Sequence, residues 1–574
     1  MQFANRYRIP AILCALAVLL CEILAHPVAN MGVCDDGPYI LIARTLANTG
    51  HIVYNGWPAA MLGWQLYLGA AFIKIFGFSF TVVRMSTICV AMITAAVLQR
   101  TLVLAGITER NATFGTLVLV LSPLYLVLTA TFMSDITGLF AIVICLYGCL
   151  RALHARTQRA MIFWLCFAVA TNAVCGTSRQ ICWLGILILV PSTLWLLRGH
   201  RRVLLAGSFA NLAGIVFIFA CLQWLKHQPY VQPERLLPET FPLLHVFGQL
   251  GNLLLNIPVL ILPLFAIFLP EVRRNRPRIL AILAAVFFFY FFIASYPSHL
   301  RGGFLLEPTI GWQAGWVGVH GIFEGISVRG KAPLFLSRSV QVLLTLISFG
   351  GLAGLITVLV RRPNPSSPTT SPTLPWRQLA VLIAPFTLLY VLLLVPRATT
   401  WLFDRYLLPL LVIAVLCLVR YYQDRISPRL PLATLALITM TAAWGVTITH
   451  NVFSLYRGRA AVAAELRASG IPDTSVDNGW EYNLDVELEH APTINYPTLA
   501  VPAHVYVPVP PPLPGVCPME RYNYTPHIHP LYGVSFDPDA CYGLASFAPV
   551  HYSRWLASGP GTLYVVRYIS PSKD

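Results

Sequence analysis

Long apolar runs recur along most of the chain and constrain its fold more than any other feature. A helix needs about 20 mainly apolar residues to cross the hydrocarbon core of a bilayer. Runs of about this length predict about 13 transmembrane helices, at 9–29, 79–99, 113–131, 136–153, 160–177, 181–197, 203–225, 246–269, 279–296, 337–360, 379–396, 406–420 and 432–450. The predicted fold class is therefore an all-α polytopic membrane protein, not a soluble enzyme with a membrane anchor.

The first run could also be a signal peptide, because it follows Arg6 and Arg8. Its length and the lack of a clean small-x-small cleavage site favour a retained membrane helix.

Composition agrees with a membrane protein. Of the 574 residues, 57% are hydrophobic and 11% are charged, whereas a soluble domain carries about a quarter charged residues. A soluble fold could not cover this much apolar surface. The formal net charge of +16 would suggest nucleic acid in a soluble protein, but arginines on cytoplasmic loops explain it better. We expect membrane lipids, and no nucleic acid, as partners.

Basic residues gather in alternate loops between the predicted helices. These groups are Arg151/Arg156/Arg159, Arg198/Arg201/Arg202, Arg273/Arg274/Arg276/Arg278, Arg361/Arg362/Arg377 and Arg420/Arg425/Arg429. All fall on the side of the N-terminus if each run crosses once. The positive-inside rule then predicts a cytoplasmic N-terminus, and an odd number of helices places the C-terminus outside.

The chain divides into two predicted domains. Residues 1–455 form the transmembrane domain, in which the Pro/Ser/Thr-rich linker 363–375 is expected to be flexible. Residues 456–574 are more polar and predict a small α/β extracytoplasmic domain, with a helix at 458–468 and a strand at 562–569. Outside the cytoplasm, a disulfide between Cys517 and Cys541 is chemically reasonable.

The first outer loop, residues 30–78, carries adjacent acids, Asp35 and Asp36, directly before Gly37-Pro38. An Asp before Pro is typical of a capped helix start, which is a purely structural alternative to chemistry. Residues 39–48 and 61–76 predict two short helices in the membrane interface. Two such helices beside an acidic pair suggest an active-site platform.

This arrangement resembles the GT-C superfamily of membrane glycosyltransferases, in particular the branch of protein O-mannosyltransferases and lipid A aminoarabinose transferases (glycosyltransferase family 39-like). The stretch Asp35-Asp36-Gly37-Pro38-Tyr39, with Ala43-Arg44 and Gly50, is similar to that family's first-loop pattern. Phe132-Met133-Ser134-Asp135 resembles its second acidic site, and Asp404-Arg405-Tyr406-Leu407-Leu408-Pro409 its late arginine motif.

The resemblance implies about 13 helices of GT-C type and transfer of a single sugar, with inversion. The donor would be a dolichyl- or undecaprenyl-phosphate type of sugar, and the acceptor a lipid, glycan or protein on the outer face. The implied location is the bacterial inner (plasma) membrane. The chain departs from the family in having Asp-Asp in place of Asp-Glu, and in lacking the Glu-Lys before Pro at Asn55-Gly56-Trp57-Pro58. The sequence therefore establishes no cofactor, and a divalent metal stays an open alternative that no clear motif supports.

The family match predicts Asp35 as the general base, with Asp36 and Asp135 orienting the acceptor or tuning the base. A partly desolvated carboxylate beside other acids should have a raised pKa. The donor phosphate would bind arginines, which donate a planar fork of hydrogen bonds. The outer-facing candidates for this role are Arg179, Arg405, and Arg301 with His299. Arginines near helix ends also snorkel to lipid headgroups, and His299 could be an ordinary loop residue.

Some features keep two interpretations. The aromatic and Gly-rich segment 298–335, with Trp312 and Trp316, fits either a lid or an ordinary interfacial loop. Asp477, Trp480 and Glu481 fit either substrate contacts or an ordinary surface. We expect Arg84 to be structural.

The main competing function is a transporter or flippase, which would show ionisable residues in mid-span, broken helices or inverted repeats. A non-catalytic scaffold is the other alternative, but it gives no reason for acids and arginines to share one face. The acids cluster at outer turns, which favours chemistry at the membrane surface.

Overall fold

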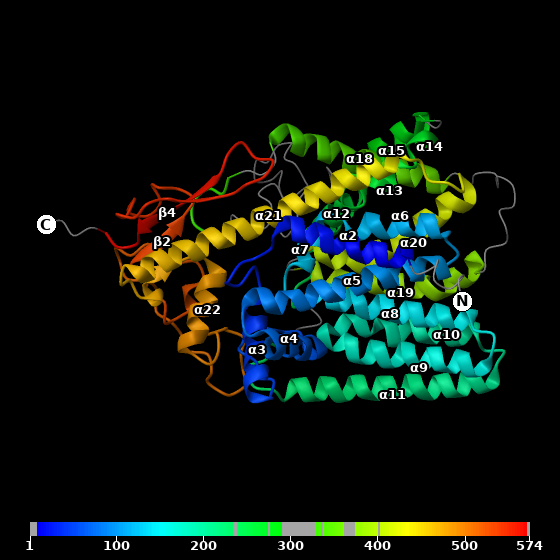
Figure 1. Cartoon of the computed structure of the whole chain (residues 1–574), viewed down its shortest axis with the longest axis horizontal. Helices are drawn as coiled ribbons and strands as arrows, with labels where there is room; N and C mark the ends of the chain where they lie inside the picture. The colour runs from blue at the N-terminus through cyan, green and yellow to red at the C-terminus, as the bar shows by residue number, and fades with distance from the viewer. Residues whose placement is uncertain are drawn as a thin grey trace.

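The computed structural model describes residues 9–233, 238–273, 276–289, 328–333, 337–360, 374–399 and 402–570. A bundle of helices forms one part of the molecule and a small sheet with its own helix forms the other (Figure 1). Nine helices in these ranges are long and apolar enough to cross a membrane, or up to ten if a bent pair is one span. These findings confirm the predicted class, an all-α polytopic protein with a small α/β C-terminal domain.

The long helices of the bundle follow the predicted runs. They are α5 (Phe80–Leu104), α8 (Ser134–His154), α9 (Gln158–Cys175), α11 (Arg201–Lys226), α12 (Leu243–Leu260), α18 (Arg338–Val360), α19 (Trp376–Arg397), α20 (Leu408–Arg425) and α21 (Ala433–Ala468).

Other predicted runs form short or broken helices. The run 113–131 is bent by 67° between α6 (Glu109–Val120) and α7 (Pro123–Thr129). Proline cannot continue a helical ladder, and Pro123 instead starts α7, where its missing N–H is not needed. The remaining short helices are α2 (Ile9–Ala25), α10 (Val190–Leu196), α13 (Leu262–Ala266), α14 (Leu269–Arg273) and α15 (Arg276–Phe289). The number of crossings therefore remains a prediction.

The first outer loop contains the two expected short helices, α3 (Asp36–Thr49) and α4 (Gly63–Phe76). Helix α3 ends at Gly50, whose φ of 77° is a left-handed conformation that glycine adopts without steric cost. Both helices lie at the end of the bundle that faces the C-terminal domain (Figure 1). The loop is thus placed between the long helices of the bundle and the C-terminal domain.

Helix α21 is a single helix of 36 residues that passes through the predicted domain boundary. At about 1.5 Å per residue it is about 54 Å long, far more than the roughly 30 Å hydrocarbon core. The separate helix predicted at 458–468 is in fact its last turns. Figure 1 shows α21 running from the bundle to the C-terminal sheet, so a continuous helix joins the two parts.

The C-terminal sheet has the order β1-β2-β4-β3. Strands β1 (Val476–Asp477) and β2 (Tyr532–Ser535) are parallel, whereas β4 (Gly561–Arg567) is antiparallel to β2 and to β3 (Val550–Tyr552). Helix α22 (Trp480–His490) follows β1. The predicted strand at 562–569 is confirmed as β4.

The two tail cysteines are bonded to each other. A disulfide joins Cys517 to Cys541, as the sequence suggests. It ties the segment between α22 and β2 to the segment between β2 and β3.

The basic loop after α8 lies at the end of the bundle remote from the C-terminal domain. Asp135 opens this 21-residue helix beside the first outer loop, so Arg151 in its last turn lies at the other end. This relative placement agrees with the charge pattern. Which end faces the cytoplasm stays a prediction.

Candidate active site

Four of the predicted side chains come together where the bundle meets the C-terminal domain. Asp35 lies just before α3, Asp135 in the first turn of α8, and Arg179 between the short helical turns η1 (Gly176–Ser178) and η2 (Gln180–Trp183). Arg405 lies in the turn η5 (Asp404–Leu407) before α20. All four residues lie in turns or at helix ends, where side chains from different helices can come together.

Arg405 bridges the two acids. Its Nη2 lies 3.9 Å from Oδ2 of Asp35, and its Nε lies 3.8 Å from Oδ1 of Asp135. Arg179 forms an ion pair with the same oxygen of Asp135. The other oxygen of Asp135 is buried and accepts no hydrogen bond from the described residues. Two carboxylates and two guanidiniums thus form one charge cluster.

Aromatic rings support both arginines. The guanidinium of Arg405 lies 4.2 Å from the ring centre of Phe403, and that of Arg179 lies 4.7 Å from the ring centre of Tyr406. Such cation–π contacts orient a planar guanidinium without using its N–H donors. The donor groups are therefore held in position for an anionic ligand.

Asp35 is the accessible acid of the cluster, because its side chain is 30% exposed and that of Asp135 is 1% exposed. Asp35 is the residue before α3, but its side chain makes no capping hydrogen bond, so capping does not explain it. Burial raises the pKa of Asp35 above its usual range, with Arg405 and Arg521 opposing the shift. A reachable carboxylate with a raised pKa is suited to accept a proton.

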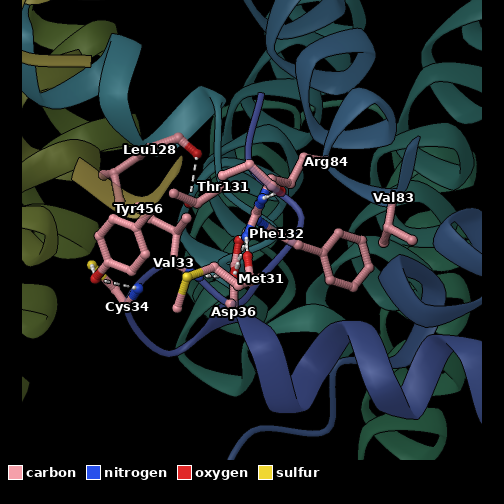
Figure 2. Close-up of polar contacts among 12 residues, drawn as sticks. Met31, Val33, Cys34, Asp36, Val83, Arg84, Leu128, Thr131, Phe132 and Tyr456 are labelled. Carbon is pink, nitrogen blue, oxygen red and sulfur yellow. Dashed lines mark hydrogen bonds and ion pairs between the residues drawn. The ribbon is translucent and has the colours of Figure 1, made fainter. Parts of the chain in front are cut away.

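Asp36 has a different environment (Figure 2). Its Oδ2 and Oδ1 accept hydrogen bonds of 2.7 and 2.9 Å from Nε and Nη2 of Arg84. The backbone amides of Val33 and Phe132 add bonds of 2.7 and 3.1 Å. Asp36 is fully buried, and its two oxygens are occupied. This geometry gives Asp36 a structural role, because it holds the loop to α5 and to the turn before α8. Its expected role in orienting the acceptor stays a prediction.

A second set of contacts connects the acidic loop to the outer domain. The amide of Cys34 donates to the hydroxyl of Tyr456 over 3.3 Å, as Figure 2 shows. That hydroxyl donates to Oε1 of Glu481 over 2.5 Å, and Nη1 of Arg459 lies 3.0 Å from Oε2. Tyr456 and Arg459 belong to α21 and Glu481 to α22, so both outer elements fix the residue next to Asp35.

Asp485 of α22 also contacts the loop. Its Oδ2 accepts the amide N–H of Gly32 over 3.0 Å. A Cβ atom at Gly37 would lie 2.6 Å from its Oδ1, so the close approach requires glycine there. Burial raises the pKa of Asp485 to about 7. Tyr456 and Asp485 are each one of several polar residues in α21 and α22, so no sequence pattern singles them out for this role.

Other predicted site residues cannot be placed. His299, Arg301 and most of the segment 298–335 lie outside the described residues. Among the described residues, no group of three or more His, Cys, Asp or Glu side chains is arranged to hold a metal ion. A divalent metal therefore stays an open alternative, as in the sequence analysis.

Comparisons with known proteins were made for the whole chain. No protein-family model matches, and no curated protein matches either. Among solved structures, ArnT from Cupriavidus metallidurans bound to undecaprenyl phosphate is 14% identical with a TM-score of 0.41, covering 97% of this chain and 99% of that one. ArnT in the apo state is 17% identical with a TM-score of 0.38, covering 79% of each chain.

A further match is the S. cerevisiae protein O-mannosyltransferase Pmt1–Pmt2 complex bound to its sugar donor. It is 16% identical with a TM-score of 0.32, covering 38% of this chain and 32% of that one. The aligned part therefore spans about a third of the mannosyltransferase chain. At these identities and TM-scores, the three matches carry no argument about the family or the reaction.

Proposed function

We propose that this protein is a membrane glycosyltransferase. It moves a single sugar from a polyprenyl-phosphate donor to a lipid, glycan or protein acceptor at the outer face, with Asp35 as the base. The observation that carries the proposal is the cluster itself, in which Arg405 lies between the reachable acid Asp35 and the buried acid Asp135. A base and an anion-binding group stand side by side at the end of the membrane bundle.

The proposed reaction is a direct displacement at the anomeric carbon. The acceptor hydroxyl gives its proton to Asp35 as its oxygen bonds to that carbon. The bond from the carbon to the phosphate oxygen breaks, and polyprenyl phosphate leaves with the electron pair. A positioned carboxylate base contributes about 10²–10⁴-fold to such a step. Attack from the side opposite the leaving group inverts the configuration.

The departing phosphate needs cations more than it needs a proton. Arg405 and Arg179 present guanidiniums that are oriented by Phe403 and Tyr406. Binding of phosphate would draw Arg405 away from Asp35, which removes the charge that holds the pKa of Asp35 down. Donor binding thereby makes Asp35 a stronger base, and this couples donor occupancy to catalysis.

The test of the arginine role is donor binding. In purified protein, Arg405→Ala should weaken binding of a polyprenyl-phosphate sugar by roughly tenfold or more, as expected for a lost charge-assisted contact. Arg457, which is exposed and donates to backbone carbonyls, provides a control as Arg457→Ala. An unchanged dissociation constant for Arg405→Ala would refute the phosphate role.

A further inference from the structure

A cavity of about 500 Å³ lies in the outer domain, apart from the charge cluster. Its wall comes from the outer segment 328–330, the junction of β1 with α22, and the segment 518–521. The volume is within the range of small-molecule sites, about 300–1,000 Å³. The cavity can therefore hold one or two sugar rings.

The charged side chains on this wall differ in whether they are free to bind a ligand. Asp477 is fully used, because Asn483 Nδ2 and the hydroxyl of Tyr568 each donate to it over 2.7 Å. Arg329 donates to the same Tyr568 hydroxyl through Nε. The side chain of Arg521 is exposed, and its guanidinium lies 4.8 Å from the ring centre of Trp480. Arg521 is the cation best presented to the cavity.

Trp480 is itself held in place by other aromatic rings. Its ring centre lies 5.1 Å from that of Trp57 and 5.4 Å from that of Tyr524. Its buried indole N–H donates to no described residue. Stacking on a fixed indole orients the guanidinium of Arg521 at the wall of the cavity.

We infer that this cavity binds an anionic saccharide, with Arg521 stacked on Trp480 receiving its acidic group. A sugar supplies hydroxyls that donate to the exposed carboxylate of Glu520, and its phosphate or carboxylate pairs with the guanidinium. The saccharide class follows from a hydrogen-bond acceptor and a cation on the wall of a cavity of this size.

The cavity is connected to the proposed base. Arg521 lies near enough to Asp35 for its charge to lower the pKa of that carboxyl. The residue after Trp480 is Glu481, which bonds to the Tyr456 hydroxyl that also contacts Cys34. The donor arginines lie at the helix ends, whereas this cavity belongs to the outer domain. The occupant is therefore the acceptor, a role that rests on the proposed function, although the binding itself does not.

Direct binding tests this site independently of transfer. The full chain, purified in nanodiscs, is titrated calorimetrically with glucuronic acid, glucose 1-phosphate, glucose and inorganic phosphate. One or both anionic sugars should bind more tightly than glucose and inorganic phosphate, and Arg521→Gln should weaken that binding by roughly tenfold. The control Arg567→Gln, on the exposed end of β4, should bind as the wild type does.

The two anionic probes show whether the acidic group is a carboxylate or a phosphate. No binding of either sugar, equal binding of inorganic phosphate, or no effect of Arg521→Gln would overturn the inference. If the wild type binds the sugar but shows no sugar transfer, this result would contradict the proposed function and leave the binding inference intact.

Discussion

The buried pair of Arg84 and Asp36 offers a quantitative test of how the acidic loop is held. Arg84 also donates to the carbonyls of Ala29 and Met31 over 2.8 and 2.7 Å, so four of its hydrogen bonds hold the loop. Both side chains are at most 1% exposed. Removing one partner of such a pair leaves an uncompensated buried charge, which costs about 3–5 kcal/mol.

We therefore expect Asp36→Asn and Arg84→Met each to lower the free energy of unfolding by about 3–5 kcal/mol. The double variant removes both charges and should lose less than the sum of the two, by up to about 3 kcal/mol. Arg100, on the same helix as Arg84, pairs with Glu109 of α6 and is the matched control, because both side chains are 29% exposed. Arg100→Met should cost about 0–1 kcal/mol.

The assay is steric trapping or SDS titration of the purified protein, together with sugar transfer per folded molecule. The double variant should keep more transfer activity than Asp36→Asn, because the loop no longer carries an unpaired charge. Additive losses of stability would refute the pairing argument. A double variant as inactive as the single one, with full stability, would show that Asp36 is catalytic.

Three further predictions concern the contacts around Asp35. Tyr456→Phe removes the hydroxyl between Cys34 and Glu481 and should lower the free energy of unfolding by about 1–3 kcal/mol. It should also lower kcat while the donor dissociation constant is unchanged. An unaltered kcat would argue against a role of Tyr456 in positioning Asp35. The transfer rate should rise with pH through the pKa of Asp35, which burial raises above the usual aspartate value. Arg521→Gln should move this rise in rate to higher pH, because that arginine lowers the pKa of Asp35. A pH profile that does not move would contradict the electrostatic connection. Asp485 has a folded pKa of about 7 against 3.8, so the folded state binds more protons in that window and stability should fall as pH rises from about 4 to 7. Asp485→Asn should flatten this dependence by at most about 4 kcal/mol, and an unchanged slope in chemical unfolding at pH 5 and 8 would exclude Asp485 as its source.

The membrane fold was predictable from sequence because apolar length alone defines a spanning helix. The two interfacial helices of the first loop were predictable for the same reason, since α3 and α4 are amphipathic or apolar but short. The sequence did not show that α21 is one continuous helix across the predicted domain boundary. The fall in hydropathy after Tyr456 suggests a new element. Helix α21 nevertheless continues without a break, because the following stretch is rich in alanine and contains no proline.

The grouping of acids and arginines was suggested by a family resemblance rather than by spacing. Their pairing depends on which turns meet at the end of the bundle, and this is a tertiary property. The different roles of Asp35 and Asp36 could not be separated from sequence either. The two residues are adjacent and chemically identical, and only the ion pair of Asp36 with Arg84 on α5 distinguishes them.

The central claim is that Asp35 is the base in sugar transfer from a polyprenyl phosphate. It is tested most directly by mass spectrometry of glycolipids and glycoproteins from cells that produce either the wild type or Asp35→Asn at equal membrane levels. The expected result is a product heavier by one sugar with the wild type and none with Asp35→Asn. The same product in equal amount from both would contradict the claim.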